Sequence, residues 1–133
     1  MGESYKFALP CYAHVNKRKI KKIPLNLNWY RNAHHMQCNL VKHNYCPDPL
    51  FEGHPGQVDS VTIRYTLFLA TNRRTDVMNW VSIADKFFCD WLVDYRVLAD
   101  DDWRRVTGFS AEVKPPDENT KINWILAEVF PNG

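Results

Sequence analysis

A strand-like segment followed by a helix-like segment constrains the fold more than any other feature of the chain. Apolar and polar residues alternate along Val58–Ala70, which predicts a strand with one buried face. After a turn at 71–74, Asp76–Tyr95 places its large apolar residues on one face of a long helix. Thr75 or Asp76 can cap this helix, because either side-chain oxygen can accept a bond from a free backbone amide.

Weaker patterns complete the predicted architecture. Two further segments are predicted strands, Arg104–Val113 and Ile122–Phe130. Tyr5–Val15 is predicted to be a strand that lies at an edge or is interrupted at Pro10. Asn26–Tyr45 has apolar spacings of three and four, which predict a helix. With 133 residues, the chain has the length of one domain, 1–133. The order of elements predicts an α+β fold, with a mixed four-stranded sheet and two main helices packed on one face.

Composition limits the class of protein. The 17 basic and 15 acidic residues give a net charge of only +2, so this is not a strongly basic protein. No stretch approaches the roughly 18 to 20 apolar residues of a membrane span. The N-terminus has no basic segment followed by an apolar one, and the four cysteines form no dense framework. We therefore expect a cytoplasmic protein with free thiols.

Basic residues gather in three places that can bind phosphates. The first place holds Lys17, Arg18, Lys19, Lys21 and Lys22, and the others hold the pairs Arg73-Arg74 and Arg104-Arg105. For the lysine-rich cluster alone, a solvated loop is an equally good interpretation.

Acidic residues lie at the start of the long helix and just after it. At about 100° per residue, Asn79, Lys86 and Asp90 fall within roughly 80° of Asp76. Asp85 lies almost opposite and about 13 Å further along the axis, too far to share a metal ion with Asp76. A divalent-cation site therefore needs a ligand from elsewhere. A strand running back along the sheet could bring one of Asp100, Asp101 and Asp102 beside Asp76; the alternative is that these three form an exposed turn.

The run Arg73-Arg74-Thr75-Asp76-Val77-Met78-Asn79, with Leu98-Ala99-Asp100-Asp101-Asp102 before a strand, resembles the RusA family of phage-type Holliday-junction resolvases. The order of elements is also similar, so the resemblance covers most of the chain. It implies a homodimeric endodeoxyribonuclease that uses Mg²⁺ or Mn²⁺ to nick four-way DNA junctions, in the host cytoplasm if the protein is phage-encoded.

By this resemblance, Asp76 matches the first metal aspartate and Asn79 the motif asparagine. Asp101 matches the later aspartate, with Asp100 and Asp102 possible by a one-residue shift. Met78 stands where the family has a second aspartate, and Ser82 where it has a lysine. Lys86, one helical turn beyond Ser82, is the candidate cation of the catalytic set Asp76, Asp101 and Lys86. Asp85 and Asp90 are secondary candidates.

Two other interpretations stay open. Because of Met78, the chain can be a catalytically degenerate relative that binds DNA, or one that binds and inhibits a host protein. A group of nitrogen and sulfur ligands suggests a zinc site, although its spacing fits no familiar finger. This group consists of His34, His35, Cys38, His43 and Cys46. Polar helix positions and buried thiols account for it better.

Overall fold

The computed structural model describes residues 3–14 and 22–132, and the expected strand and helix form its centre. Strand β5 (Val61–Phe68) buries alternate side chains, and α3 (Val77–Asp94) packs on that buried face. Asp76 is the N-cap of α3, and its carboxylate accepts a hydrogen bond from the backbone amide of Met78 at 3.1 Å. The predicted pair is confirmed, with slightly shorter boundaries.

The sheet is mixed, as expected, but it has five strands rather than four. The strand order is β4-β1-β7-β5-β6; β5 and β6 run parallel, and every other neighbouring pair is antiparallel. A separate two-stranded ribbon pairs β2 with β3. The strands other than β5 are β1 (Tyr5–Pro10), β2 (Tyr12–His14), β3 (Lys22–Pro24), β4 (Asp48–Pro49), β6 (Val106–Lys114) and β7 (Trp124–Pro131).

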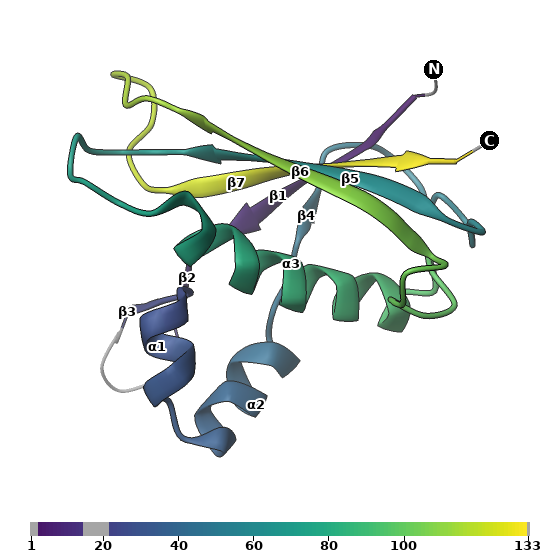
Figure 1. Cartoon of the computed structure of the whole chain (residues 1–133), viewed down its shortest axis with the longest axis horizontal. Helices are drawn as coiled ribbons and strands as arrows, with labels where there is room; N and C mark the ends of the chain where they lie inside the picture. Colours follow the sequence, from purple (N-terminus) through teal and green to yellow (C-terminus); the bar gives the residue numbers. More distant parts are fainter. Residues whose placement is uncertain (1–2, 15–21, 133) are drawn as a thin grey trace.

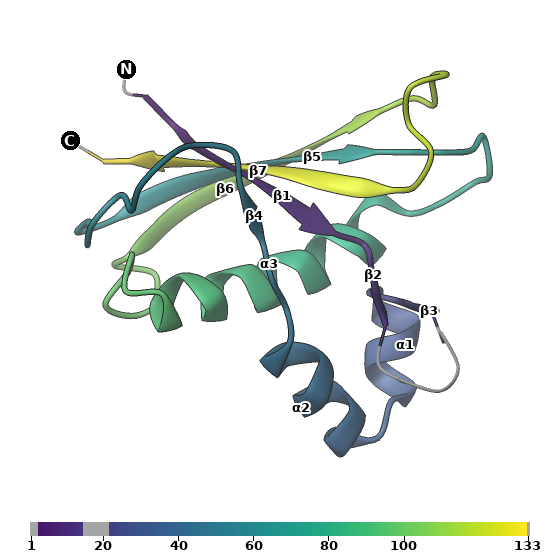
Figure 2. The same cartoon turned by 180° about the vertical axis from the view of Figure 1, so that it is seen from behind.

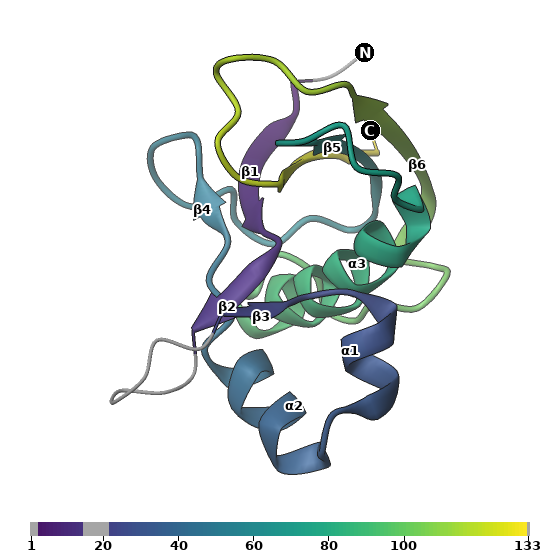
Figure 3. The ribbon, with the colours of Figure 1, turned by 90° about the vertical axis from the view of Figure 1, so that its left-hand side faces the viewer.

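All helices lie on one side of the sheet, and α3 forms a middle layer (Figures 1 to 3). One face of α3 packs on the sheet, where the rings of Phe88 and Phe7 are 5.1 Å apart. The opposite face packs on α1 (Leu27–Asn32) and on the segment after α2 (His35–His43), where Phe87 meets Tyr45 at 5.5 Å. Both faces are apolar because each is buried. Within the described residues, no helix is long and apolar enough to cross a membrane.

The expectation of one helix over Asn26–Tyr45 is wrong, because the segment breaks into α1 and α2. Ala33 and His34 both adopt extended backbone angles, which end the first helix and start the second. Each helix has its own cap: Asn26 Oδ1 accepts from the amide of Trp29, and His34 Nδ1 accepts from the amide of Met36. An imidazole cap is uncommon, so the residue pattern contained no signal for the second start.

The β5–α3–β6 connection fixes which ends of the elements meet. Because β6 runs parallel to β5, α3 must run back antiparallel to both. The start of α3 therefore lies near the end of β5, and the end of α3 lies near the start of β6 (Figure 1). With 18 residues, α3 separates these two ends by about 27 Å.

Candidate functional site

The two acidic groups expected to share a metal ion lie at opposite ends of α3. Asp76 caps its N-terminus, whereas Asp100, Asp101 and Asp102 follow its C-terminus and precede β6. The expectation that the next strand returns an aspartate to Asp76 is wrong, because β6 begins at the far end of the sheet. One chain therefore does not bring these carboxylates together.

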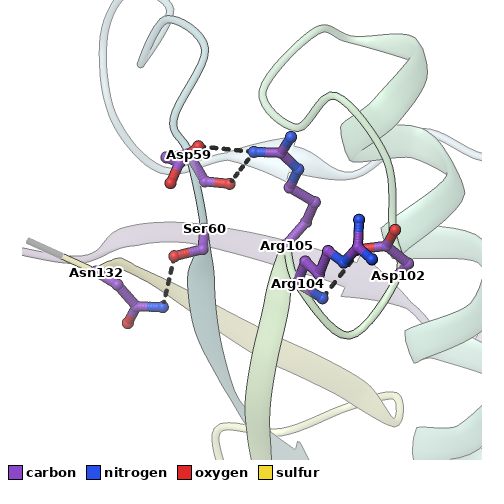
Figure 4. A network of polar contacts seen from close by, with 6 residues as sticks. All are labelled: Asp59, Ser60, Asp102, Arg104, Arg105 and Asn132. Carbon is purple, nitrogen blue, oxygen red and sulfur yellow. Dashed lines mark hydrogen bonds and ion pairs between the residues drawn. The ribbon is translucent and has the colours of Figure 1, made fainter.

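Asp102 lies in a separate polar region with Arg104, Arg105 and Asp59 (Figure 4). Partial burial, and then the charges of Asp90 and Asp100, raise the pKa of the Asp101 carboxyl. Asp102 accepts a hydrogen bond from the backbone amide of Arg104 at 3.0 Å. Arg105 forms an ion pair with Asp59 at 2.7 Å and also donates to its carbonyl oxygen. Arg104 and Arg105 thus lie far from Arg73 and Arg74.

The polar side chains along α3 mainly form contacts with neighbouring helices. Asn79 Oδ1 accepts from the amide of Leu27 at 3.0 Å and so ties α3 to the start of α1. Asp90 pairs with Lys42 at 2.9 Å. Lys86 lies over the ring of Tyr30, with its Nζ atom 5.7 Å from the centroid.

Asp85 points toward the sheet. Its carboxylate accepts hydrogen bonds from the Tyr65 hydroxyl and the Cys89 thiol, two groups that are themselves buried. This arrangement anchors α3 to β5 through a polar contact inside an apolar interface.

The residues that resemble the family motif do not fit an Mg²⁺ or Mn²⁺ ion within one chain. Hard cations prefer several oxygen ligands, but Met78 offers none and the Asn79 oxygen is already bonded to Leu27. Across residues 3–14 and 22–132, no three His, Cys, Asp or Glu side chains gather so that they could hold a metal ion. That finding covers both the aspartate set and the suggested zinc ligands.

A cleft of about 640 Å³ lies at the N-terminal end of α3, and the described residues that line it include several cations but no carboxylate. The walls come from the β2–β3 ribbon, the start of α1, the segment from β5 to α3 and the loop before β7. The cations are Lys22, Arg73, Arg74 and Lys121. We call this feature the donor cleft.

Three of the four asparagines that line the donor cleft use their side-chain oxygens for bonds within the protein. The side-chain oxygen of each accepts a backbone amide: Asn26 from Trp29 and Asn79 from Leu27. Asn123 accepts from Ala70 at 2.8 Å. Within the described part of the chain, their side-chain NH₂ groups have no protein acceptor. The cleft therefore offers N–H donors and positive charge, which suits a ligand made of acceptors.

Aromatic contacts hold the walls of the donor cleft in place. Thr75 Oγ1 accepts a hydrogen bond from the Trp80 indole at 2.9 Å, which fixes the ring beside the start of α3. Tyr12 packs edge-on against Trp80, with centroids 5.5 Å apart. Lys22 Nζ lies 4.0 Å from the centre of the Tyr12 ring. This cation–π contact keeps the positive charge of Lys22 beside the β2–β3 ribbon.

The sequence identified only part of this cleft. Arg73, Arg74 and Lys22 were phosphate-binding candidates and do line it. The other members of the lysine-rich cluster lie outside the described residues; these are Lys17, Arg18, Lys19 and Lys21. Lys121 and the asparagines at 26 and 123 were missed, because only the tertiary fold brings them beside Arg73.

Comparison of the sequence with models of known protein families and with curated proteins finds no match.

Proposed function

We propose that this chain binds nucleic acid and holds the phosphodiester backbone in the donor cleft. One observation carries the proposal: the lining combines four cations with asparagine N–H donors and has no carboxylate. Phosphodiester oxygens accept hydrogen bonds and carry negative charge, so they complement this lining in both respects. The motif resemblance supports branched DNA as the form of nucleic acid, and a four-way junction as the first ligand to test.

Fluorescence anisotropy with a labelled four-way junction and a linear duplex tests the proposal. The double substitution R73A/R74A removes two cations, so the slope of log K against log salt should become shallower by about 1.4 to 1.8. The matched control is R31A/R96A, which removes two exposed arginines that do not line the donor cleft. Equal slopes for the two double variants would refute binding at the cleft. Equal affinity for junction and duplex would refute only the preference for branches.

Cleavage of the bound DNA is a second candidate function, favoured by the position of Asp76. This carboxylate directly follows Thr75, which lines the donor cleft. Since the described residues of one chain supply no further carboxylate there, a divalent ion would need oxygen ligands from the DNA or from another protein chain.

Incubating junction DNA with wild type and with Asp76→Asn, in Mg²⁺ or Mn²⁺, tests cleavage directly. Nicking by wild type that is lost in Asp76→Asn supports the candidate. Intact DNA with wild type, or equal nicking by both proteins, rejects it and leaves the binding proposal standing.

A further inference from the structure

The two edges of the five-stranded sheet differ in how they are protected. One edge ends in β4, which has only two residues and contains Pro49. Short strands and prolines discourage further pairing. The other edge is β6, with nine residues from Val106 to Lys114, and no described strand pairs with its outer side. An unprotected edge of this length is a template for another strand.

The hydrogen bonds between β5 and β6 show which residues face the open edge. Leu69 donates its amide to the carbonyl of Lys114, at the end of the parallel pair. In a parallel pair, bonding residues alternate along the strand, so even-numbered residues from 108 to 114 bond to β5. Phe109, Ala111 and Val113 therefore direct their N–H and C=O groups outward.

The same part of β6 exposes apolar side chains. Phe109 is 56% exposed and Val113 is 43% exposed. Both are in register with buried residues of β5, Ile63 and Leu67, and so lie on the sheet face that α3 covers. At the edge, α3 leaves them uncovered. Unpaired backbone groups and large apolar side chains thus coincide on one strip of surface.

We propose that this strip pairs with β6 of a second copy of the chain, antiparallel, with Ala111 opposite Ala111 of the other copy. This register places Phe109 of each copy opposite Val113 of the other, so each exposed side chain is covered by an apolar partner. The outward groups of Phe109, Ala111 and Val113 then form about six N–H···O bonds. The two sheets join into one continuous sheet around a two-fold axis.

The residues that flank β6 favour this register and a second copy. Arg104 precedes the strand, and Asp117 and Glu118 follow it. Antiparallel pairing puts the basic start of one copy beside the acidic end of the other. A two-residue slide in one direction sets Phe109 opposite Pro115, which has no N–H to donate. A two-residue slide in the other direction sets Val113 opposite the polar Thr107, so Val113 loses its apolar partner. The flanking charges and the apolar residues of the strip are thus complementary between two antiparallel copies.

A charge exchange tests both the interface and its register. F109K and V113E should each give particles of single-chain mass in sedimentation velocity at about 50 µM, a concentration at which wild type should have twice that mass. The double variant F109K/V113E should recover the double mass, because the introduced lysine of each copy then faces the introduced glutamate of the other. The control M36K introduces a positive charge at an exposed apolar position on α2 and should keep the wild-type mass.

Disulfide formation provides a second measurement that does not disturb the charges. Residues directly opposite in a hydrogen-bonded pair have Cα atoms about 5.5 Å apart, within the range of a disulfide. Ala111→Cys should therefore cross-link two copies on mild oxidation, whereas Ser110→Cys, on the other sheet face, should not. A wild type of single-chain mass, failure of the double variant to recover the mass, or equal cross-linking of both cysteine variants would overturn the proposal. DNA binding by the single-chain variants would show that the donor cleft acts independently.

Discussion

Replacing Asn79 by aspartate separates the structural role of this residue from its proposed role in the donor cleft. Asn79 Oδ1 accepts the amide of Leu27 at 3.0 Å, and its NH₂ group remains available to a ligand. Aspartate keeps the acceptor but loses the donor and adds a negative charge. Asn79→Asp should therefore remain folded while it binds nucleic acid more weakly.

The size of each effect follows from this contact. In Asn79→Ala the Leu27 amide loses its partner, which should lower the free energy of unfolding by about 1 to 2 kcal/mol. In Asn79→Asp the free energy of unfolding should stay within about 1 kcal/mol of wild type, because the amide keeps an acceptor. The added charge faces the phosphates across a partly hydrated cleft and should weaken binding by about 1 to 2 kcal/mol, or roughly 5- to 30-fold.

Urea unfolding measures the first effect, and anisotropy with labelled DNA at about 0.1 M salt measures the second. Asn39→Asp adds the same charge on α2, outside the donor cleft, and should leave the affinity near that of wild type. Wild-type affinity in a folded Asn79→Asp variant would refute the idea that the backbone lies against the donor groups. An equal loss in Asn79→Asp and Asn39→Asp would show that only the net charge matters.

Two further predictions concern the interface between α3 and the sheet. Asp85→Ala leaves the Tyr65 hydroxyl and the Cys89 thiol without their acceptor, and should lower the free energy of unfolding in urea by about 2 to 3 kcal/mol. Asp85→Asn keeps an acceptor oxygen and should lower it less. Equal losses in the two variants would contradict this account. Burial raises the pKa of the Cys11 thiol to about 12, and burial with the nearby Asp85 charge raises the pKa of Cys89. Both thiols have an ordinary pKa near 9.0, so the unfolded chain releases these protons first as pH rises. Stability should therefore be fully present below about pH 9 and fall above it, by up to about 1.4 kcal/mol per thiol for each pH unit. Cys11→Ala should reduce this slope in urea titrations between about pH 8 and pH 10.5, and an unchanged slope would contradict the assignment.

The sequence predicted well those elements whose pattern depends on a single buried face. Val61, Ile63 and Tyr65 alternate toward the core, so β5 was recognisable, and the cap at Asp76 marked the start of α3. The short strands were harder. β4 has two residues, too few for any period, and β3 follows directly on the lysine-rich segment.

The site was predicted less well than the fold, because it depends on contacts distant in sequence. Arg73 and Arg74 were identified from their position before a helix. Nothing local to Asn123 indicates that it faces them from the loop before β7. The expected pairing of Asp76 with Asp101 failed for a topological reason, since a parallel crossover separates the two ends of its helix.

The polarity of α3 also shapes how the molecule meets a polyanion in solution. Lys22, Arg73, Arg74 and Lys121 surround its N-terminal end, whereas consecutive aspartates follow its C-terminal end. The backbone dipole of the helix has the same sense, with its positive end at the donor cleft. The donor cleft at this end of α3 therefore carries a local positive potential. A positive cleft attracts a polyanion during diffusion, and we expect association with nucleic acid to slow as salt screens this attraction.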